Sequence, residues 1–100
     1  MSASNEKRNR LLKQIREALI GIRREIQKAE RGEESLDGLQ QLIFIESKLA
    51  EMEQALDRED WSAAERTKPG MARLVVDTWP MQDALGTLIT EIEYEYERLK

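Results

Sequence analysis

Apolar residues recur at steps of three and four along the segment from Leu12 to Ala29. An α-helix has 3.6 residues per turn, so residues with this spacing form one stripe along one side of a helix. The spacing is that of a heptad seam and predicts a helix from about Glu6 to Arg31 that packs against another helix. Residues 1–5 are expected to form a disordered tail. The stripe consists of Leu12, Ile15, Leu19, Ile22, Ile26 and Ala29.

A second heptad seam lies in residues 36–57, which are predicted to form the next helix. Gly32 suits the left-handed cap that ends many helices, and Ser35 is placed to cap the helix that follows. Because the linker is short, the two helices must run antiparallel, as a coiled-coil-like hairpin. The second seam consists of Leu42, Ile45, Leu49, Met52 and Leu56.

Charged residues beside the two seams predict how the helices of the hairpin are aligned. One alignment places three pairs of opposite charge across the interface, whereas an alignment shifted by seven residues brings fewer charges together. Surface ion pairs contribute only a few tenths of a kcal/mol each, so they select the alignment more than they stabilise it. The predicted pairs are Arg16 with Glu53, Arg23 with Glu46, and Glu25 with Lys48.

The helix predicted over residues 36–57 carries a second apolar stripe, about 100° around its axis from the first. A helix with two apolar stripes usually contacts two neighbouring helices. We therefore expect this helix to be the central one of the fold, packed between two neighbouring helices. The second stripe consists of Leu36, Leu39, Ile43 and Ala50.

After the break at Lys68-Pro69-Gly70, apolar residues again step by three and four up to Leu99. Because the phase of this pattern is the same before and after Pro80, we predict one helix from about Met71 to Leu99, kinked near Pro80. An interior proline costs about 3 kcal/mol, so a complete break at Pro80 is the alternative. In that case Thr78 would cap a helix that begins at Trp79.

The predicted fold is all-α: an antiparallel three-helix bundle that contains the hairpin, in a single domain of residues 1–100. A short extra helix is expected around residues 61–67. The chain has two prolines and five glycines, and 36% of its residues are charged against 5% aromatic, a composition that favours long helices over a sheet. At 100 residues, such a domain buries enough surface to fold without a disulfide or a metal.

The chain contains no cysteine and no histidine, which excludes thiol nucleophiles, zinc sites and imidazole acid–base catalysis. It also lacks a glycine-rich phosphate loop and a nucleophile motif. We therefore predict no enzyme activity, no cofactor and no metal site. No apolar run approaches the roughly 20 residues of a membrane span, and the absence of cysteine fits a reducing cytoplasm, so a cytoplasmic location is expected.

Charge is distributed unevenly along the chain. Residues 1–31 contain nine Lys/Arg and four Glu, whereas the whole chain has a net charge of −4. A basic helix packed against acidic helices accounts for this asymmetry, and a nucleic-acid-binding face on the first helix is the alternative. The acidic run at Glu91, Glu93, Glu95 and Glu97 is predicted to be an exposed helix end.

One side of the last predicted helix combines large aromatic residues with small ones and carries little charge. Tryptophan and tyrosine beside small residues are typical of protein interfaces, although the same residues could complete the core of the chain itself. We predict a non-enzymatic interaction module that forms a homodimer or binds a partner protein. The candidate partner-binding residues are Val76, Trp79, Gly86, Thr87, Thr90 and Tyr94, with Phe44 and Trp61 as further aromatic candidates.

Overall fold

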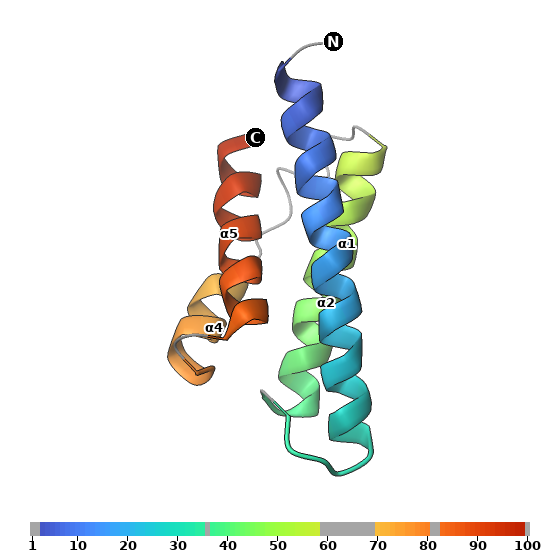
Figure 1. Cartoon of the computed structure of the whole chain (residues 1–100), viewed down its shortest axis with the longest axis vertical. Coiled ribbons are helices and arrows are strands. Elements are labelled where there is room, and N and C mark those ends of the chain that lie inside the picture. The colour runs from blue at the N-terminus through green and yellow to red at the C-terminus, as the bar shows by residue number, and fades with distance from the viewer. Residues whose placement is uncertain (1–2, 36, 59–69, 81–82, 100) are drawn as a thin grey trace.

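A computed structural model describes residues 3–35, 37–58, 70–80 and 83–99. All of the regular secondary structure in these ranges is helical, which confirms the all-α prediction. The helices are α1 (Ala3–Glu30), α2 (Leu39–Asp57), α4 (Met71–Thr78) and α5 (Ala84–Leu99). Figure 1 shows α1 and α2 side by side, with α5 along one side of them and α4 against α5. The expected short helix around residues 61–67 lies outside the described residues.

The connection between α1 and α2 begins at Gly32, as the sequence predicted. Gly32 has a φ of 75°, and the N–H groups of Gly32 and Glu33 donate to the carbonyls of Ala29 and Lys28. These are the two hydrogen bonds of a Schellman motif, which needs a left-handed residue at this position. The start of α1 at Ala3 precedes the expected start at Glu6, so the helix includes part of the segment expected to be a tail.

The start of α2 differs from the prediction. The helix begins at Leu39 instead of Leu36, and its N-cap is Gly38, which has an extended backbone. Ser35 does not cap this helix, because its hydroxyl donates to the Asp37 carbonyl at 2.8 Å. Asp37 lies before α2, where its Oδ1 accepts from the N–H of Gly38 at 2.8 Å and its Oδ2 accepts from another part of the chain, the Trp79 indole.

The predicted alignment of the hairpin is supported by two of its three ion pairs. Arg16 Nε lies 3.0 Å from Glu53 Oε2, and Arg23 Nε lies 3.0 Å from Glu46 Oε2. The members of the third predicted pair are engaged within their own helices. Glu25 binds Lys28 at 2.9 Å, and Lys48 lies 3.6 Å from Glu51.

Charge reversal at the Arg23–Glu46 pair tests this alignment. Arg23→Glu should lower the free energy of unfolding by roughly 0.5 kcal/mol, because both side chains are substantially exposed and solvent screens them. Adding Glu46→Arg should recover most of that loss, as measured by urea denaturation in a double-mutant cycle. The matched control is Arg24→Glu, which should show no coupling to Glu46→Arg. A coupling energy of zero for the Arg23–Glu46 pair would mean that the alignment is wrong.

The prediction of one continuous helix through Pro80 is wrong. Helix α4 ends at Thr78, and Trp79 has an extended backbone with φ −95° and ψ 156°. Proline disfavours the α conformation of the residue before it, so Pro80 stops the helix where the apolar period would have continued it. The alternative of a complete break is confirmed, since α4 and α5 are separate helices, but the second helix begins at Ala84 and not at Trp79.

Two acidic side chains cap the helices around this break. Asp83 Oδ1 accepts from the N–H of Gly86 at 2.9 Å, so Asp83 is the N-cap of α5. Glu93 Oε1, on α5, accepts from the N–H groups of Met71 and Ala72 at 2.7 and 3.3 Å. A glutamate from one helix thereby satisfies the free N–H groups at the start of another, which holds α4 beside α5.

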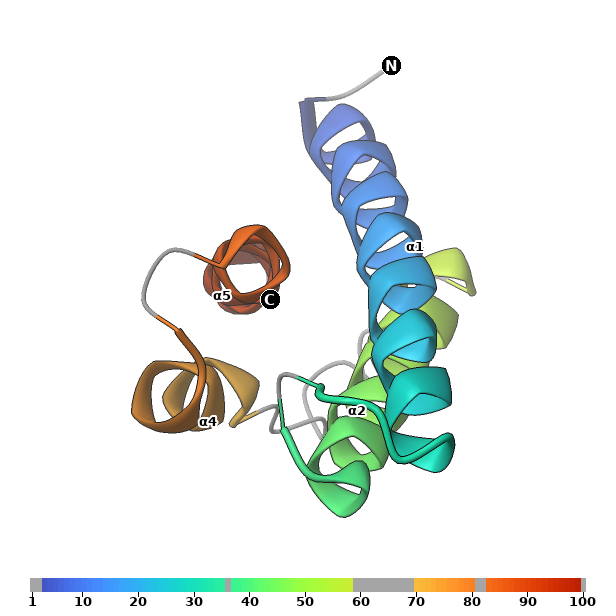
Figure 2. The same ribbon diagram turned by 60° about the horizontal axis from the view of Figure 1, so that its bottom comes forward.

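The central helix of the described fold is α1, and the prediction that the second helix is central is wrong. Extensive contacts join α1 to α2, α1 to α5, and α4 to α5. Figures 1 and 2 both show α4 and α5 on one side of the hairpin. Leu39 and Ile43, from the second apolar stripe of α2, are 37% and 48% exposed.

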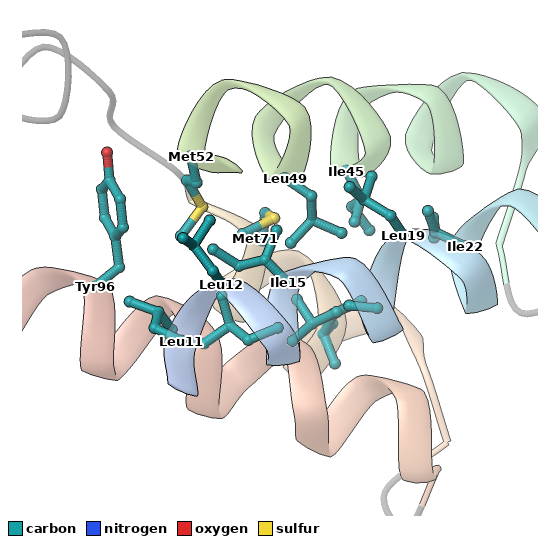
Figure 3. Packing of buried hydrophobic residues seen from close by; sticks show 14 of the residues in the cluster. Leu11, Leu12, Ile15, Leu19, Ile22, Ile45, Leu49, Met52, Met71 and Tyr96 are labelled. Carbon is teal, nitrogen blue, oxygen red and sulfur yellow. The ribbon is translucent and has the colours of Figure 1, made fainter. Parts of the chain in front are cut away.

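The core lies where the hairpin meets the pair formed by α4 and α5. Figure 3 shows Leu12 and Ile15 of α1 beside Leu49 and Met52 of α2, with Met71 among them. Most of the seam residues are fully buried, as the heptad pattern predicted. The buried hydrophobic residues are Leu11, Leu12, Ile15, Ala18, Leu19, Ile22, Leu42, Ile45, Leu49, Met52, Ala55, Leu56, Met71, Val75, Trp79, Ile89, Ile92 and Tyr96.

Candidate functional site

Five of the eight candidate partner-binding residues line one pocket at the corner between α4 and α5. The sequence placed them along one side of a continuous helix, whereas in the structure the chain turns back between Trp79 and Ala84 and brings two helices together. The pocket has a volume of about 320 Å³. Its walls are formed by Val75, Val76, Trp79, Pro80, Asp83, Gly86, Thr87, Thr90 and Glu91.

Trp79 forms the inner wall of this pocket and belongs to the core. Its side chain is only 5% exposed, so most of the aromatic area that the sequence offered to a partner is covered within the chain. The indole Nε1 donates to Asp37 Oδ2 at 3.0 Å, and the backbone N–H donates to the Val75 carbonyl at 2.9 Å. Thr78 Oγ1 lies 3.1 Å from the same carboxylate oxygen and 2.7 Å from the Leu74 carbonyl.

Gly86 lets α5 approach the indole closely. A Cβ at this position would lie 3.2 Å from Trp79 Cε3 and 3.0 Å from Val75 Cγ1, which is closer than side chains normally pack. The absence of a side chain on Gly86 therefore allows this contact, and Gly86 also lines the pocket. Thr90 Oγ1 donates to the Gly86 carbonyl at 2.9 Å, so this hydroxyl on the pocket wall already has a partner.

The exposed apolar surface at this corner comes from Val76 and Tyr94. Val76 is 71% exposed on α4, and Tyr94 is 61% exposed one turn beyond Thr90 on the same side of α5. The guanidinium carbon of Arg98 lies 5.5 Å from the centre of the Tyr94 ring. Thr87 is also exposed. We call the pocket together with Tyr94 the corner site.

The two remaining candidates are Phe44, which lines a different hollow, and Trp61. Phe44 is partly buried on α2, with Lys48 Nζ 5.7 Å from its ring centre. It lines a different hollow of about 430 Å³ that it shares with Leu74 of α4. Trp61 lies outside the described residues.

A third hollow, of about 570 Å³, lies between α1 and α5. Charged residues of both signs line it, which leaves it without a preference for one class of charged ligand. Its walls are formed by Lys7, Arg10, Leu11, Gln14, Glu91, Glu95 and Arg98.

Three acidic residues that organise the corner site were not identified from the sequence as such. They are Asp37, Asp83 and Glu93, which anchor Trp79, cap α5 and cap α4 respectively. Asp83 has a local signal, since it stands three residues before Gly86 and could have been recognised as a cap. The contacts of Asp37 and Glu93 join residues 42 and 22 positions apart and have no local signal.

Several kinds of chemistry find no support among the described residues. They contain no group of three or more acidic side chains placed to hold a metal ion. None of the described helices is long and apolar enough to cross a membrane.

Comparison with protein-family models, curated proteins and solved structures found no significant match to this chain.

Proposed function

We propose that this chain is a non-enzymatic, cytoplasmic protein-interaction module that binds a segment of a partner protein at the corner site. The observation that carries the proposal is the pocket between α4 and α5, beside two exposed apolar side chains. Protein interfaces usually depend on a few apolar or aromatic anchors that enter pockets of this kind. Helices α4 and α5 supply most of the pocket wall, and a preformed site favours binding because it loses little conformational entropy when it is filled.

The size of the pocket indicates what it accepts. Its volume of about 320 Å³ is at the lower end of the roughly 300–1,000 Å³ range of small-ligand pockets, and suits one or two large side chains. Apolar wall residues such as Val75 and Trp79 favour leucine, methionine or phenylalanine as the anchor. The partner segment therefore presents a large apolar residue toward α4 and α5.

The charges on the pocket wall, as distinct from Arg98 beside Tyr94, specify the surroundings of that anchor. Both charged residues on the pocket wall, Asp83 and Glu91, are acidic. Opposite charges across an interface accelerate association and exclude partners with the wrong charge. We therefore propose that lysine or arginine flanks the apolar anchor of the partner.

Selection of binding peptides from a phage-displayed library tests the proposal with a defined probe. The selected peptides should share a large apolar residue next to lysine or arginine. Val76→Lys should weaken their binding at least tenfold, because it adds bulk and positive charge at the pocket while changing a residue that is 71% exposed.

The matched control is Ile20→Lys, which introduces the same charge at an exposed aliphatic residue on α1. Peptide binding to this variant should equal that of the wild type. Peptides that bind Val76→Lys as tightly as the wild type, or that lack the apolar anchor, would contradict the proposal.

Nucleic-acid binding by α1 is the weaker alternative. Four basic residues of the α1 region are already bound to glutamates, which reduces the positive potential that a phosphate backbone requires. These residues are Arg16, Arg23, Lys28 and Arg31.

A further inference from the structure

An exposed isoleucine on α1 marks a surface away from the corner site. Ile20 is 55% exposed and lies four residues after Arg16 and three before Arg23, so the three side chains share one face of the helix. Ala18 is fully buried outside the heptad seam, which indicates that it faces α5, the second helix in extensive contact with α1. Two residues turn a helix by about 200°, so Ile20 points away from α5.

Helix α2 adds exposed apolar residues to the same side of the hairpin. Ile43 lies three residues before Glu46, and Ala50 lies between Glu46 and Glu53, the two glutamates that bind the arginines beside Ile20. Leu39 and Ile43 are 37% and 48% exposed, and Ala50 is partly buried. We call this face, which carries Ile20, Leu39, Ile43 and Ala50, the outer flank of the hairpin.

We propose that the outer flank is the interface at which a second copy of this chain binds, independently of the function proposed for the corner site. Helices α1 and α2 have 28 and 19 residues, so at a rise of about 1.5 Å per residue and a diameter of about 10 Å, one face of the hairpin spans roughly 700 Å². Stable protein interfaces of standard size bury roughly 600–1,000 Å² of each partner. The face is therefore within the range of a standard interface between two copies.

Charge selects how the two copies are arranged. Helix α1 has eight basic and four acidic residues, a net charge of +4, whereas α2 has one basic and four acidic residues, a net charge of −3. The Arg16–Glu53 and Arg23–Glu46 ion pairs neutralise two charges on each helix, which leaves +2 on α1 and −1 on α2. If α1 faced α1 of the second copy, like charges would meet along the interface. A two-fold axis parallel to the helices instead places α1 over α2 of the second copy, which brings opposite charges together.

The shapes of the side chains fit the same arrangement. Within one chain, the Arg16–Glu53 and Arg23–Glu46 ion pairs lie on either side of both Ile20 and Ala50, so these two residues lie at the same height along the hairpin. A two-fold axis parallel to the helices preserves that height. The large Ile20 of each copy then meets the small Ala50 of the other, so the interface is complementary to itself.

Sedimentation equilibrium over a range of protein concentrations tests the proposal. The wild type should approach twice the mass of one chain at high concentration. Ile20→Glu should raise the dissociation constant at least tenfold, because it removes apolar contact and places a negative charge opposite the acidic α2. Ile20→Lys removes the same contact but keeps charge complementarity, so its dissociation constant should be several-fold lower than that of Ile20→Glu.

Tyr94→Glu is the control on the opposite side of the fold, and it should leave the dissociation constant unchanged. A wild type that is monomeric at millimolar concentration would overturn the proposal. If Ile20→Lys raised the dissociation constant as much as Ile20→Glu or more, the arrangement of α1 over α2 would be wrong. The corner site has its own readout in peptide binding, so failure of one proposal is distinguishable from failure of the other.

Disulfide cross-linking tests the contact between copies directly. The chain has no cysteine, so introduced thiols report only on the positions chosen. A mixture of Ile20→Cys and Ala50→Cys chains should form a cross-linked pair under oxidising conditions. Ile20→Cys alone should not cross-link appreciably. A disulfide that forms equally well in Ile20→Cys alone would show that α1 faces α1, contrary to the proposal.

Discussion

Replacing Trp79 with alanine should lower the free energy of unfolding by about 3–5 kcal/mol, the range for removing a buried aromatic side chain. The indole is 5% exposed and lies against Gly86, and its Nε1–H donates to Asp37. The substitution therefore removes apolar contacts and also the hydrogen bond that ties the corner to the loop before α2. Urea denaturation measures the loss, and sedimentation should show an unchanged association state.

Two further variants separate the contributions at this position. Trp79→Phe keeps most of the apolar area and loses the bond to the Asp37 carboxylate, so it should cost about 1.5–3 kcal/mol and should still fold. Tyr94→Ala, on the exposed side of α5, should change stability by less than about 0.5 kcal/mol. If Trp79→Ala lowered the mass in solution and left stability unchanged, Trp79 would belong to an interface between chains.

A large loss is also expected from Ile22→Ala in the heptad seam. Ile22 is fully buried between α1 and α2, and removing three of its side-chain carbons leaves a cavity that the packed seam cannot fill. Large-to-small changes of this kind cost about 2–5 kcal/mol. The loss should appear as a lower midpoint of urea denaturation with an unchanged slope, because the surface exposed on unfolding stays nearly the same.

Ile20→Ala is the matched control, made two residues away on the same helix. Both variants gain equally from the high helix propensity of alanine, so the difference between them reports burial alone. Ile20 is 55% exposed, and its replacement should change stability by less than about 0.5 kcal/mol at protein concentrations where the chain is monomeric. Equal losses at both positions would mean that the seam is not where the heptad pattern places it.

The sequence alone was sufficient to predict the hairpin. Its seams repeat over several turns, and the residues at those positions, such as Ile15 and Leu49, are fully buried. The signal is strong because helical periodicity and the burial of apolar side chains both depend on local spacing. The break at Gly32 could also be predicted, since few residues other than glycine adopt its positive φ.

The last third of the chain shows where local spacing misleads. Its apolar period continues through Pro80 because α4 and α5 both need an apolar side toward the core, whether or not they form one helix. The sequence identified Val76, Trp79, Gly86, Thr87 and Thr90 as a group, but placed them along one continuous helix. The turn between the helices brought the same residues together around a pocket.

The chain by itself therefore determined an all-helical fold, an antiparallel hairpin and five of the nine residues that line the pocket of the corner site. Only the tertiary structure decided that Trp79 is buried, that α1 is the central helix and that Ile20, Leu39 and Ile43 stay exposed. The physical reason is the range of the interactions. Periodicity and capping act within a few residues, whereas the bonds of Asp37 to Trp79 and of Glu93 to Met71 join distant segments and determine which faces are covered.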